Sequence, residues 1–350
     1  MWRPPLRRSG LALLGMALAG PAAHASEAPA PDTPPSEDTM MEDVDTPPRW
    51  VEPPPSQPLD LHAWAEAGYL VPVGDSAEAR GAYLSLARLQ GQLHESDFDA
   101  FLQVGADHGD LDLLDARISW RPTDRVVLRA GRFKAPVSAE YLIPAPRLLF
   151  VHRSLHMALV PKRSLGAEAE VHLGPESADV ALSAGIFDPA DYALVPGSGE
   201  LVTARALLHT GSGFGAHLAG AAWIHDDTAA DALPYEAPDY ERHLVAALLF
   251  EEHGVTAVVE GALATMGDEA AAGGVASVGY RFPVGHKELS LEPATALEVL
   301  NVAGHTETVG QVALNVHPHD WNLVQTLEWE VQPNQARPSH LLYVQLQAGL

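Results

Sequence analysis

The stretch from His340 to Leu350, HLLYVQLQAGL, alternates between two kinds of side chain. The apolar positions are Leu342, Val344, Leu346, Ala348 and Leu350, and the polar or small positions between them are Tyr343, Gln345, Gln347 and Gly349. A period of two is typical of a β-strand, because successive side chains point to opposite faces of a sheet. This stretch therefore predicts a strand with one apolar face and one polar or small face.

The same alternation recurs between Leu59 and Leu350 in segments of about ten residues, separated by Gly, Pro, Asp and His. Sixteen segments fit the pattern, and they begin near residues 59, 81, 97, 111, 126, 165, 179, 200, 213, 240, 254, 274, 288, 307, 320 and 339. The period indicates an all-β domain with many short strands.

The connections between these segments differ in length in a regular way. Those after even-numbered segments have about three to five residues, whereas those after the fifth, seventh and ninth segments have about thirty, a dozen and fifteen. Outer-membrane barrels have short periplasmic turns and longer outer loops. The sequence therefore predicts a transmembrane antiparallel β-barrel of about 16 strands, in which only the second and seventh outer loops are short. A secreted soluble β-protein is the weaker alternative.

The first 58 residues differ from the rest of the chain. Residues 1–25 carry three arginines, the apolar run LALLGMALAG and the small-residue site Ala23-His24-Ala25, the pattern of a cleaved secretory signal peptide. Residues 26–58 hold ten prolines and eight acidic residues against one arginine, which predicts a disordered periplasmic arm. A short N-terminal anchor and a docking peptide are the respective alternatives. Residues 59–350 are then the barrel domain.

Positive charge is concentrated in one part of this acidic chain, whose formal net charge is −25. Between Asp115 and Arg163 there are ten basic and three acidic residues, a net charge of +7. The remainder of residues 59–350 holds seven basic and 35 acidic residues, a net charge of −28. The basic segment spans the fifth strand and the long third outer loop. Low-dielectric walls focus the field of such charges along a pore, so a few arginines can determine which ions pass.

Several motifs in and after this segment resemble the phosphate-selective porin O and P family of outer-membrane channels. They are GRFKAPVSAEYL at Gly131–Leu142, LLFVHRSL at Leu148–Leu155, PKRSLGAE at Pro161–Glu168 and AGIFDP at Ala184–Pro189. The resemblance covers about 110 residues. It implies that the third outer loop, at residues 134–164, folds into the lumen and narrows it, and that the protein is a homotrimer.

The combined interpretation is an outer-membrane porin for passive diffusion of small hydrophilic solutes, with a preference for anions and with phosphate or other oxyanions as candidate solutes. Guanidinium groups suit oxyanions because they donate paired hydrogen bonds. The candidate pore-lining residues are Arg117, Arg129, Arg132, Lys134, Arg147, Arg153, Lys162 and Arg163. Alternatively, these side chains pair with acids and hold the loop against the wall. Arg129 and Arg132 are three positions apart, so their side chains would point to opposite faces of a regular strand. One of them should therefore lie beyond the regular strand.

Other classes of function have little support in the sequence. Cysteine is absent, and no glycine pattern opens a nucleotide-binding helix, so we expect no enzyme activity and no cofactor. The tightest histidine group, His317-Pro318-His319-Asp320, is too small to predict a metal site. We expect lipid and lipopolysaccharide as surroundings and no nucleic acid as partner. The alternative function is a plugged structural or adhesive barrel, whose acidic outer loops, such as residues 224–241, bind cations or a partner.

Overall fold

The computed structural model describes residues 58–73, 80–107, 110–175, 177–188, 199–224, 241–285, 289–318, 323–333 and 339–349. The signal peptide and nearly all of the arm predicted from the sequence lie outside these residues. Those described belong to one compact unit, which spans residues 46–350. None of the helices in the described part of the chain is long and apolar enough to cross a bilayer.

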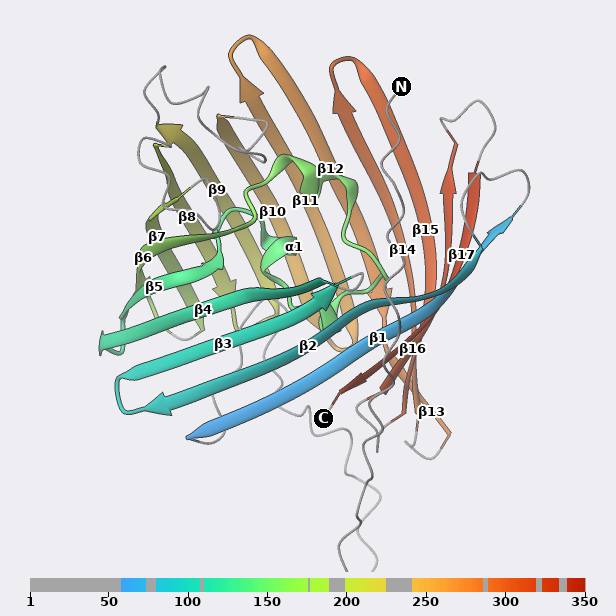
Figure 1. Ribbon diagram of the computed structural model, residues 1–350, viewed down its shortest axis with the longest axis horizontal. Coiled ribbons are helices and arrows are strands. Elements are labelled where there is room, and N and C mark those ends of the chain that lie inside the picture. Colours follow the sequence, from blue (N-terminus) through green and yellow to red (C-terminus); the bar gives the residue numbers. More distant parts are fainter. Residues whose placement is uncertain are drawn as a thin grey trace, which may run out of the picture. The chain divides into compact units, whose positions relative to one another are not determined.

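The described residues form one sheet of seventeen strand segments, all paired antiparallel (Figure 1). The segments are β1 (Leu59–Val73), β2 (Gly81–Glu95), β3 (Phe98–Asp107), β4 (Asp110–Thr123), β5 (Val126–Lys134), β6 (Arg163–Leu173), β7 (Ala178–Phe187), β8 (Glu200–Thr210), β9 (Phe214–Ile224), β10 (Arg242–Glu252), β11 (Val255–Met266), β12 (Glu269–Tyr280), β13 (Phe282–Val284), β14 (Leu289–Val302), β15 (His305–Pro318), β16 (Leu323–Gln332) and β17 (Ser339–Gly349). Three short helical elements follow β5: α1 (Ala139–Leu142), η1 (Ala145–Arg147) and η2 (Leu155–Leu159).

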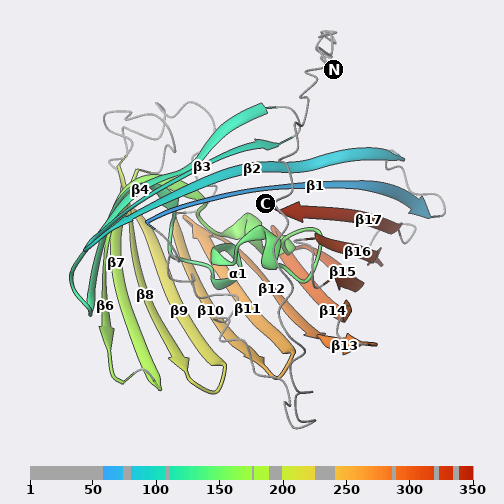
Figure 2. The ribbon, with the colours of Figure 1, turned by 90° about the horizontal axis from the view of Figure 1, so that it is seen from below.

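The sheet closes on itself. The first strand pairs with the last, from Trp64 opposite Gly349 to Val73 opposite His340, and Figure 2 shows β1 beside β17. Both β12 and β13 pair with β14, so they are one strand interrupted at Arg281. The result is a closed barrel of sixteen antiparallel strands, which confirms the predicted fold. Closure leaves no unpaired edge, as a strand structure in a bilayer requires.

Strand boundaries agree closely with the sequence prediction, with one informative exception. The twelfth strand begins at Glu269, five residues before the expected position. The connection from Met266 is therefore only Gly267 and Asp268. The sixth outer connection is thus short, as the second and seventh are, and the expectation of only two short outer connections is wrong.

Burial is inverted relative to a water-soluble protein. Apolar side chains such as Leu111 and Leu244 are exposed, with 80% and 49% of their surface accessible. Carboxylates such as Glu260 and Glu328 are buried, with 2% and 0% accessible. Each strand therefore turns an apolar row outward and a polar or small row inward, the arrangement of a barrel in a membrane.

A distorted position in β5 is possible only with glycine. Gly131 has φ of 127°, and a Cβ atom there would lie 2.1 Å from the backbone oxygen of Ala116 on the neighbouring strand. Both Arg129 and Arg132 nevertheless lie within β5. The expectation that one of them lies beyond the strand is therefore wrong, because the glycine absorbs the irregularity inside the strand.

Replacing Gly131 by alanine is expected to impair barrel assembly, because the new methyl group meets backbone that cannot rotate away. The measurement is the folded fraction after refolding into detergent micelles, from the shift in gel mobility between unheated and heated samples. Gly310→Ala on β15 is the matched control, since a Cβ there meets nothing within 4 Å. Equal folded fractions for the two variants would contradict the prediction.

Candidate functional site

The segment between β5 and β6 begins with a single helical turn that two cations close. The Ser138 hydroxyl caps α1 by accepting a hydrogen bond from the Tyr141 backbone N–H at 3.0 Å. At the other end, Lys134 Nζ donates to the Tyr141 carbonyl at 2.5 Å, and Arg153 donates to the Ile143 carbonyl at 2.5 Å. These charges satisfy carbonyl groups that a helix leaves without partners, so they fix the shape of the segment.

Four predicted site residues meet around one aromatic ring. The charged groups of Lys134, Arg153, Lys162 and Arg163 lie 5.1, 5.4, 5.4 and 5.9 Å from the centre of the Tyr141 ring. We call these four residues with Tyr141 the basic cluster. The face of an aromatic ring attracts cations. Lys134 comes from the end of β5, Arg163 from the start of β6, and Arg153 and Lys162 from the loop between these strands.

The basic cluster extends to a strand that the charge count did not single out. Arg88 on β2 lies within electrostatic range of Arg153 and Arg163, and its guanidinium carbon lies 5.8 Å from the centre of the Trp64 ring. Its neighbour Leu89 is 58% exposed, so alternation turns Arg88 inward. The same alternation in the sequence could have identified Arg88, but it stands outside the basic segment.

The acids near the cluster compensate only part of this charge. Arg163 Nε donates to Asp115 Oδ2 at 3.1 Å. Lys134 instead donates to the backbone carbonyls of residues 141, 142 and 143, and Lys162 donates to the Met157 carbonyl. Since a carbonyl is neutral, these hydrogen bonds orient the two ammonium groups without placing a negative charge beside them.

The other four candidates lie apart from this ring. Arg129 forms ion pairs with Glu168 and Glu170, at 3.3 and 2.9 Å. Arg117 lies over the Phe101 ring at 4.7 Å. Arg132 donates to the Leu114 carbonyl at 2.7 Å, and Arg147 lines a cavity of about 180 Å³ between its own segment and β16 and β17.

Arg132 and Arg117 differ in the rows they occupy. Arg132 stands opposite Leu165, which is 40% exposed on the apolar exterior. Arg117 shares its row with the buried Asp115 and Ser119, as the alternation in the sequence indicates. The register therefore groups Arg117, but not Arg132, with inward-facing residues.

Inward-facing carboxylates hold the backbone of residues 135–162. Glu260 Oε2 on β11 accepts the Glu140 N–H at 2.9 Å, and Glu328 Oε2 on β16 accepts the Val151 N–H at 2.7 Å. On β14, Glu298 Oε2 accepts the backbone N–H of residue 155 at 2.8 Å. These three hydrogen bonds come from β11, β14 and β16, so they anchor the segment to the wall at separate points.

Inward-facing imidazoles and an amide hold the carbonyl groups of the same segment. His217 Nε2 on β9 donates to the Val137 carbonyl at 3.0 Å, and His243 Nδ1 on β10 donates to the Leu159 carbonyl at 2.7 Å. On β15, Asn315 donates to the carbonyl of residue 149 at 2.9 Å. The partners of the two histidines are 80 and 84 residues away from them along the chain. Their only signal in the sequence is that each stands at a position of its strand where alternation turns the side chain inward.

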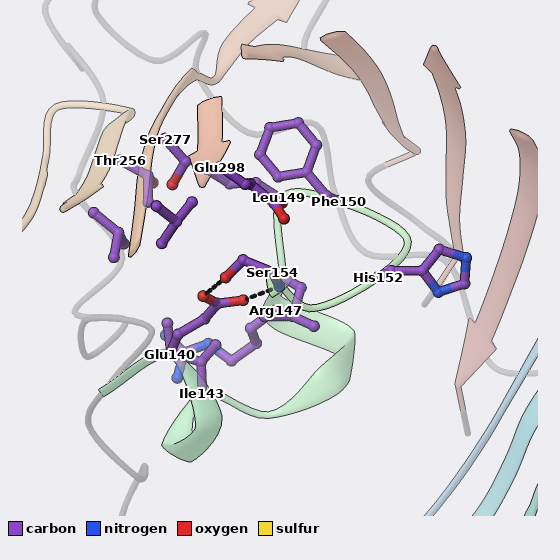
Figure 3. Close-up of a pocket in the computed structure, with 13 residues that line it drawn as sticks. Glu140, Ile143, Arg147, Leu149, Phe150, His152, Ser154, Thr256, Ser277 and Glu298 are labelled. Atoms are coloured by element: carbon purple, nitrogen blue, oxygen red, sulfur yellow. Dashed lines mark hydrogen bonds between the residues drawn. The ribbon is translucent and has the colours of Figure 1, made fainter. Parts of the chain in front are cut away.

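A smaller cavity of about 40 Å³ lies between the segment and the strands β11, β12 and β14 (Figure 3). Figure 3 shows Glu140 and Ser154 joined by two hydrogen bonds on one side and Glu298 with Ser277 on the other. In both ribbon views the helical elements lie beside β11 and β12 (Figures 1 and 2). The segment is thus packed against one side of the barrel wall.

Burial and neighbouring charge change the acidity of two loop cations. Burial lowers the pKa of Arg153, although Glu140 opposes the shift. Partial burial of the ammonium group, with the neighbouring Arg153, lowers the pKa of Lys162 to about 8. The positive charge of Lys162 is therefore lost at moderately alkaline pH.

The histidine group at residues 317–320 falls partly outside the described residues. His317 Nε2 lies 3.0 Å from Glu292 Oε2. Among the residues that the structure describes, no group of three or more potential ligands is placed to hold a metal ion. Most of the acidic loop at 224–241 also lies outside them.

Residues 79–221 match the family model of phosphate-selective porin O and P. This match confirms the resemblance that was inferred from the motifs at 131–142 and 148–155. No curated protein matches the chain closely.

Solved porin structures share the fold at low sequence identity. An anion-selective porin from Comamonas acidovorans is 10% identical, with a TM-score of 0.58 over 83% of this chain and 99% of that one. OmpF of Salmonella typhi is 13% identical, with a TM-score of 0.58 over 83% and 97%. OmpT of Vibrio cholerae is 11% identical, with a TM-score of 0.56 over 85% and 100%. The family match and the structural neighbours agree with the barrel fold of the chain.

Proposed function

We propose that this protein is an outer-membrane porin that passes small hydrophilic anions by passive diffusion, with residues 135–162 narrowing the lumen. The observation that carries the proposal is the basic cluster, in which four cations surround Tyr141 at 5.1 to 5.9 Å. The cluster joins the ends of β5 and β6 to the segment that is anchored to the wall. A concentrated positive field at a narrow point excludes cations more effectively than scattered charges do.

The basic residues could serve to hold the segment in shape or to select ions, and this geometry allows both roles. Lys134 and Arg153 bind backbone carbonyls of the segment, whereas the alternative from the sequence has such residues pair with acids. Because these carbonyl groups are neutral, the same residues keep a net positive field. A structural role and a selectivity role are therefore compatible.

The further parts of the proposal follow from the same interpretation. The chain would be exported with removal of residues 1–25, leave residues 26–58 as a periplasmic arm, and assemble as a homotrimer within lipid and lipopolysaccharide. Oxyanions, phosphate among them, are the proposed solutes, because guanidinium groups of Arg88, Arg153 and Arg163 suit their geometry. The proposal involves no catalytic step.

The test is planar-bilayer recording of the purified protein under a potassium chloride gradient. We expect discrete conductance steps and a reversal potential of the sign that marks anion preference. A cation-preferring reversal potential would refute the anion preference, and the absence of steps would favour the plugged barrel. Replacing chloride by phosphate, at equal ionic strength, then measures the preference among anions.

The anion preference is expected to fall as the pH rises through about 8. A lysine is charged below its pKa and neutral above it, and the pKa of Lys162 is about 8. Raising the pH therefore removes one positive charge from the basic cluster. The permeability ratio, measured from pH 6.5 to pH 9.5, should decrease with a midpoint near that value.

Lys162→Arg is the matched control for this titration, because a guanidinium keeps its charge over the whole range. Its permeability ratio should stay constant where that of the unmodified protein decreases. The same titration in both proteins would show that another group is responsible.

A further inference from the structure

A buried histidine in the anchored segment has a hydrogen-bond environment that fits only one protonation state. His156 on η2 is fully buried. Its Nε2 lies 3.0 Å from Glu260 Oε1, and its Nδ1 lies 3.1 Å from Ser154 Oγ. Which of the two nitrogens carries a proton can be decided by counting donors and acceptors.

The hydroxyl of Ser154 is already committed as a donor. Ser154 Oγ donates to Glu140 Oε2, and the Ser154 backbone N–H donates to Glu140 Oε1 at 2.9 Å. The oxygen that faces His156 Nδ1 is therefore an acceptor. Glu260 presents an acceptor to the other nitrogen, since its Oε1 also accepts a bond from Ser138 Oγ at 2.5 Å.

Both nitrogens of His156 thus face acceptors, and a neutral imidazole has only one N–H to donate. In either neutral tautomer one nitrogen lone pair would face an oxygen lone pair at about 3 Å. The doubly protonated imidazolium satisfies both contacts and completes a chain from Glu260 through His156 and Ser154 to Glu140.

The surrounding charges compensate a cation at this place. Glu260 comes from β11, Glu140 from α1 at 3.9 Å from Nε2, and Glu298 on β14 acts on His156 electrostatically. The facing residue on β12 is Gly273, where a Cβ atom would approach His156 Cβ to 2.9 Å. His217 on β9 also acts on Glu260. Three carboxylates therefore face the imidazole, and a buried charge is tolerated when it is paired in this way.

We propose that His156 is held as a buried imidazolium that joins α1 and η2 to β11, and that it is a positioning residue for the basic cluster. It contacts no permeating ion. It acts through Glu140 and Ser154, which fix the carbonyl groups that Arg153 binds. This inference rests on the proposed channel function only for its effect on ion flow.

The first test is ¹⁵N NMR of the histidine-labelled full chain in detergent micelles at pH 7. We expect a signal in which both ring nitrogens show protonated shifts and which is present in the unmodified protein but absent in His156→Gln. If this variant does not fold, Ser154→Ala provides the assignment, since it alters the environment of His156 Nδ1. A His156 signal with one protonated and one unprotonated nitrogen would overturn the proposal.

The second test is single-channel recording of His156→Gln beside His62→Gln, whose histidine is exposed on β1. We expect larger open-channel current fluctuations and a loss of anion preference in the first variant only. Unchanged recordings for His156→Gln would overturn the positioning role. A cation-preferring unmodified channel with an intact imidazolium signal would instead refute the proposed function and leave the buried cation standing.

Discussion

Replacing Arg88 and Arg163 together by glutamine is expected to reduce or reverse the anion preference of the channel. Both residues belong to strands, so their loss leaves the hydrogen bonds that close α1 intact. The substitution removes two positive charges and also leaves Asp115 without the ion pair that it forms with Arg163 at 3.1 Å. The net charge at this level of the barrel therefore falls by two, and the carboxylate of Asp115 is no longer neutralised by Arg163.

Coulomb's law gives the size of the effect. One unit charge acting on an ion about 6 Å away contributes about 0.7 kcal/mol in a water-like dielectric and about 3 kcal/mol at an effective dielectric constant of about 20. With about 1.4 kcal/mol for each factor of ten, one charge changes the permeability ratio by roughly threefold to a hundredfold. The measured quantity is the reversal potential under a salt gradient.

Arg125→Gln is the control for this variant, because Arg125 is exposed in the turn between β4 and β5. Salt screens the field of an exposed charge, so the loss of the Arg125 charge should have little effect on an ion in the pore. A shift of equal size in the control would mean that net charge, and not the basic cluster, determines selectivity.

The barrel could be predicted from the sequence because its strands separate two different environments. A strand with lipid on one side and polar groups on the other, such as β17, must alternate in every second residue. The strand whose start was misplaced, β12, has the sequence EAAAGGVASVGY, in which small residues occupy both faces. Its Gly273 and Gly279 leave room for His156 and Leu149 of the anchored segment. The alternation is thus absent where the loop needs space.

The charged part of the site could be predicted only in outline. The count of basic residues identified Lys134, Arg153, Lys162 and Arg163, since they lie in one stretch of chain. It could not identify Glu260, because a buried carboxylate that accepts the N–H of residue 140 is 120 residues away from it. Pairings over such distances depend on barrel register and loop path, which no local pattern records.

Glu260 is the anchor whose removal should have the largest effect on the segment. Its two oxygens accept bonds from Ser138 Oγ, the Glu140 N–H and His156 Nε2, at 2.5, 2.9 and 3.0 Å. Glu260→Ala leaves three buried donors unsatisfied. Breaking a buried ion pair from one side costs about 3 to 5 kcal/mol, more than the about 0.5 to 1.5 kcal/mol that the anchors at Glu298 and Glu328 would each contribute through one hydrogen bond. The barrel itself should still close, since β11 keeps its backbone pairing with β10 and β12.

Limited trypsin digestion in detergent micelles measures this release, because the segment contains Arg147 and Arg153. In the unmodified protein these sites are held by the wall anchors and should resist cleavage, whereas Glu260→Ala should be cut within residues 135–162 while the rest of the barrel stays intact. Glu260→Gln keeps one carbonyl acceptor and should be cleaved at an intermediate rate. Glu269→Ala, at an exposed site on β12, is the matched control. Resistance of Glu260→Ala equal to that of the control would show that the other anchors hold the segment by themselves, and the proposed role of this carboxylate would have to be abandoned.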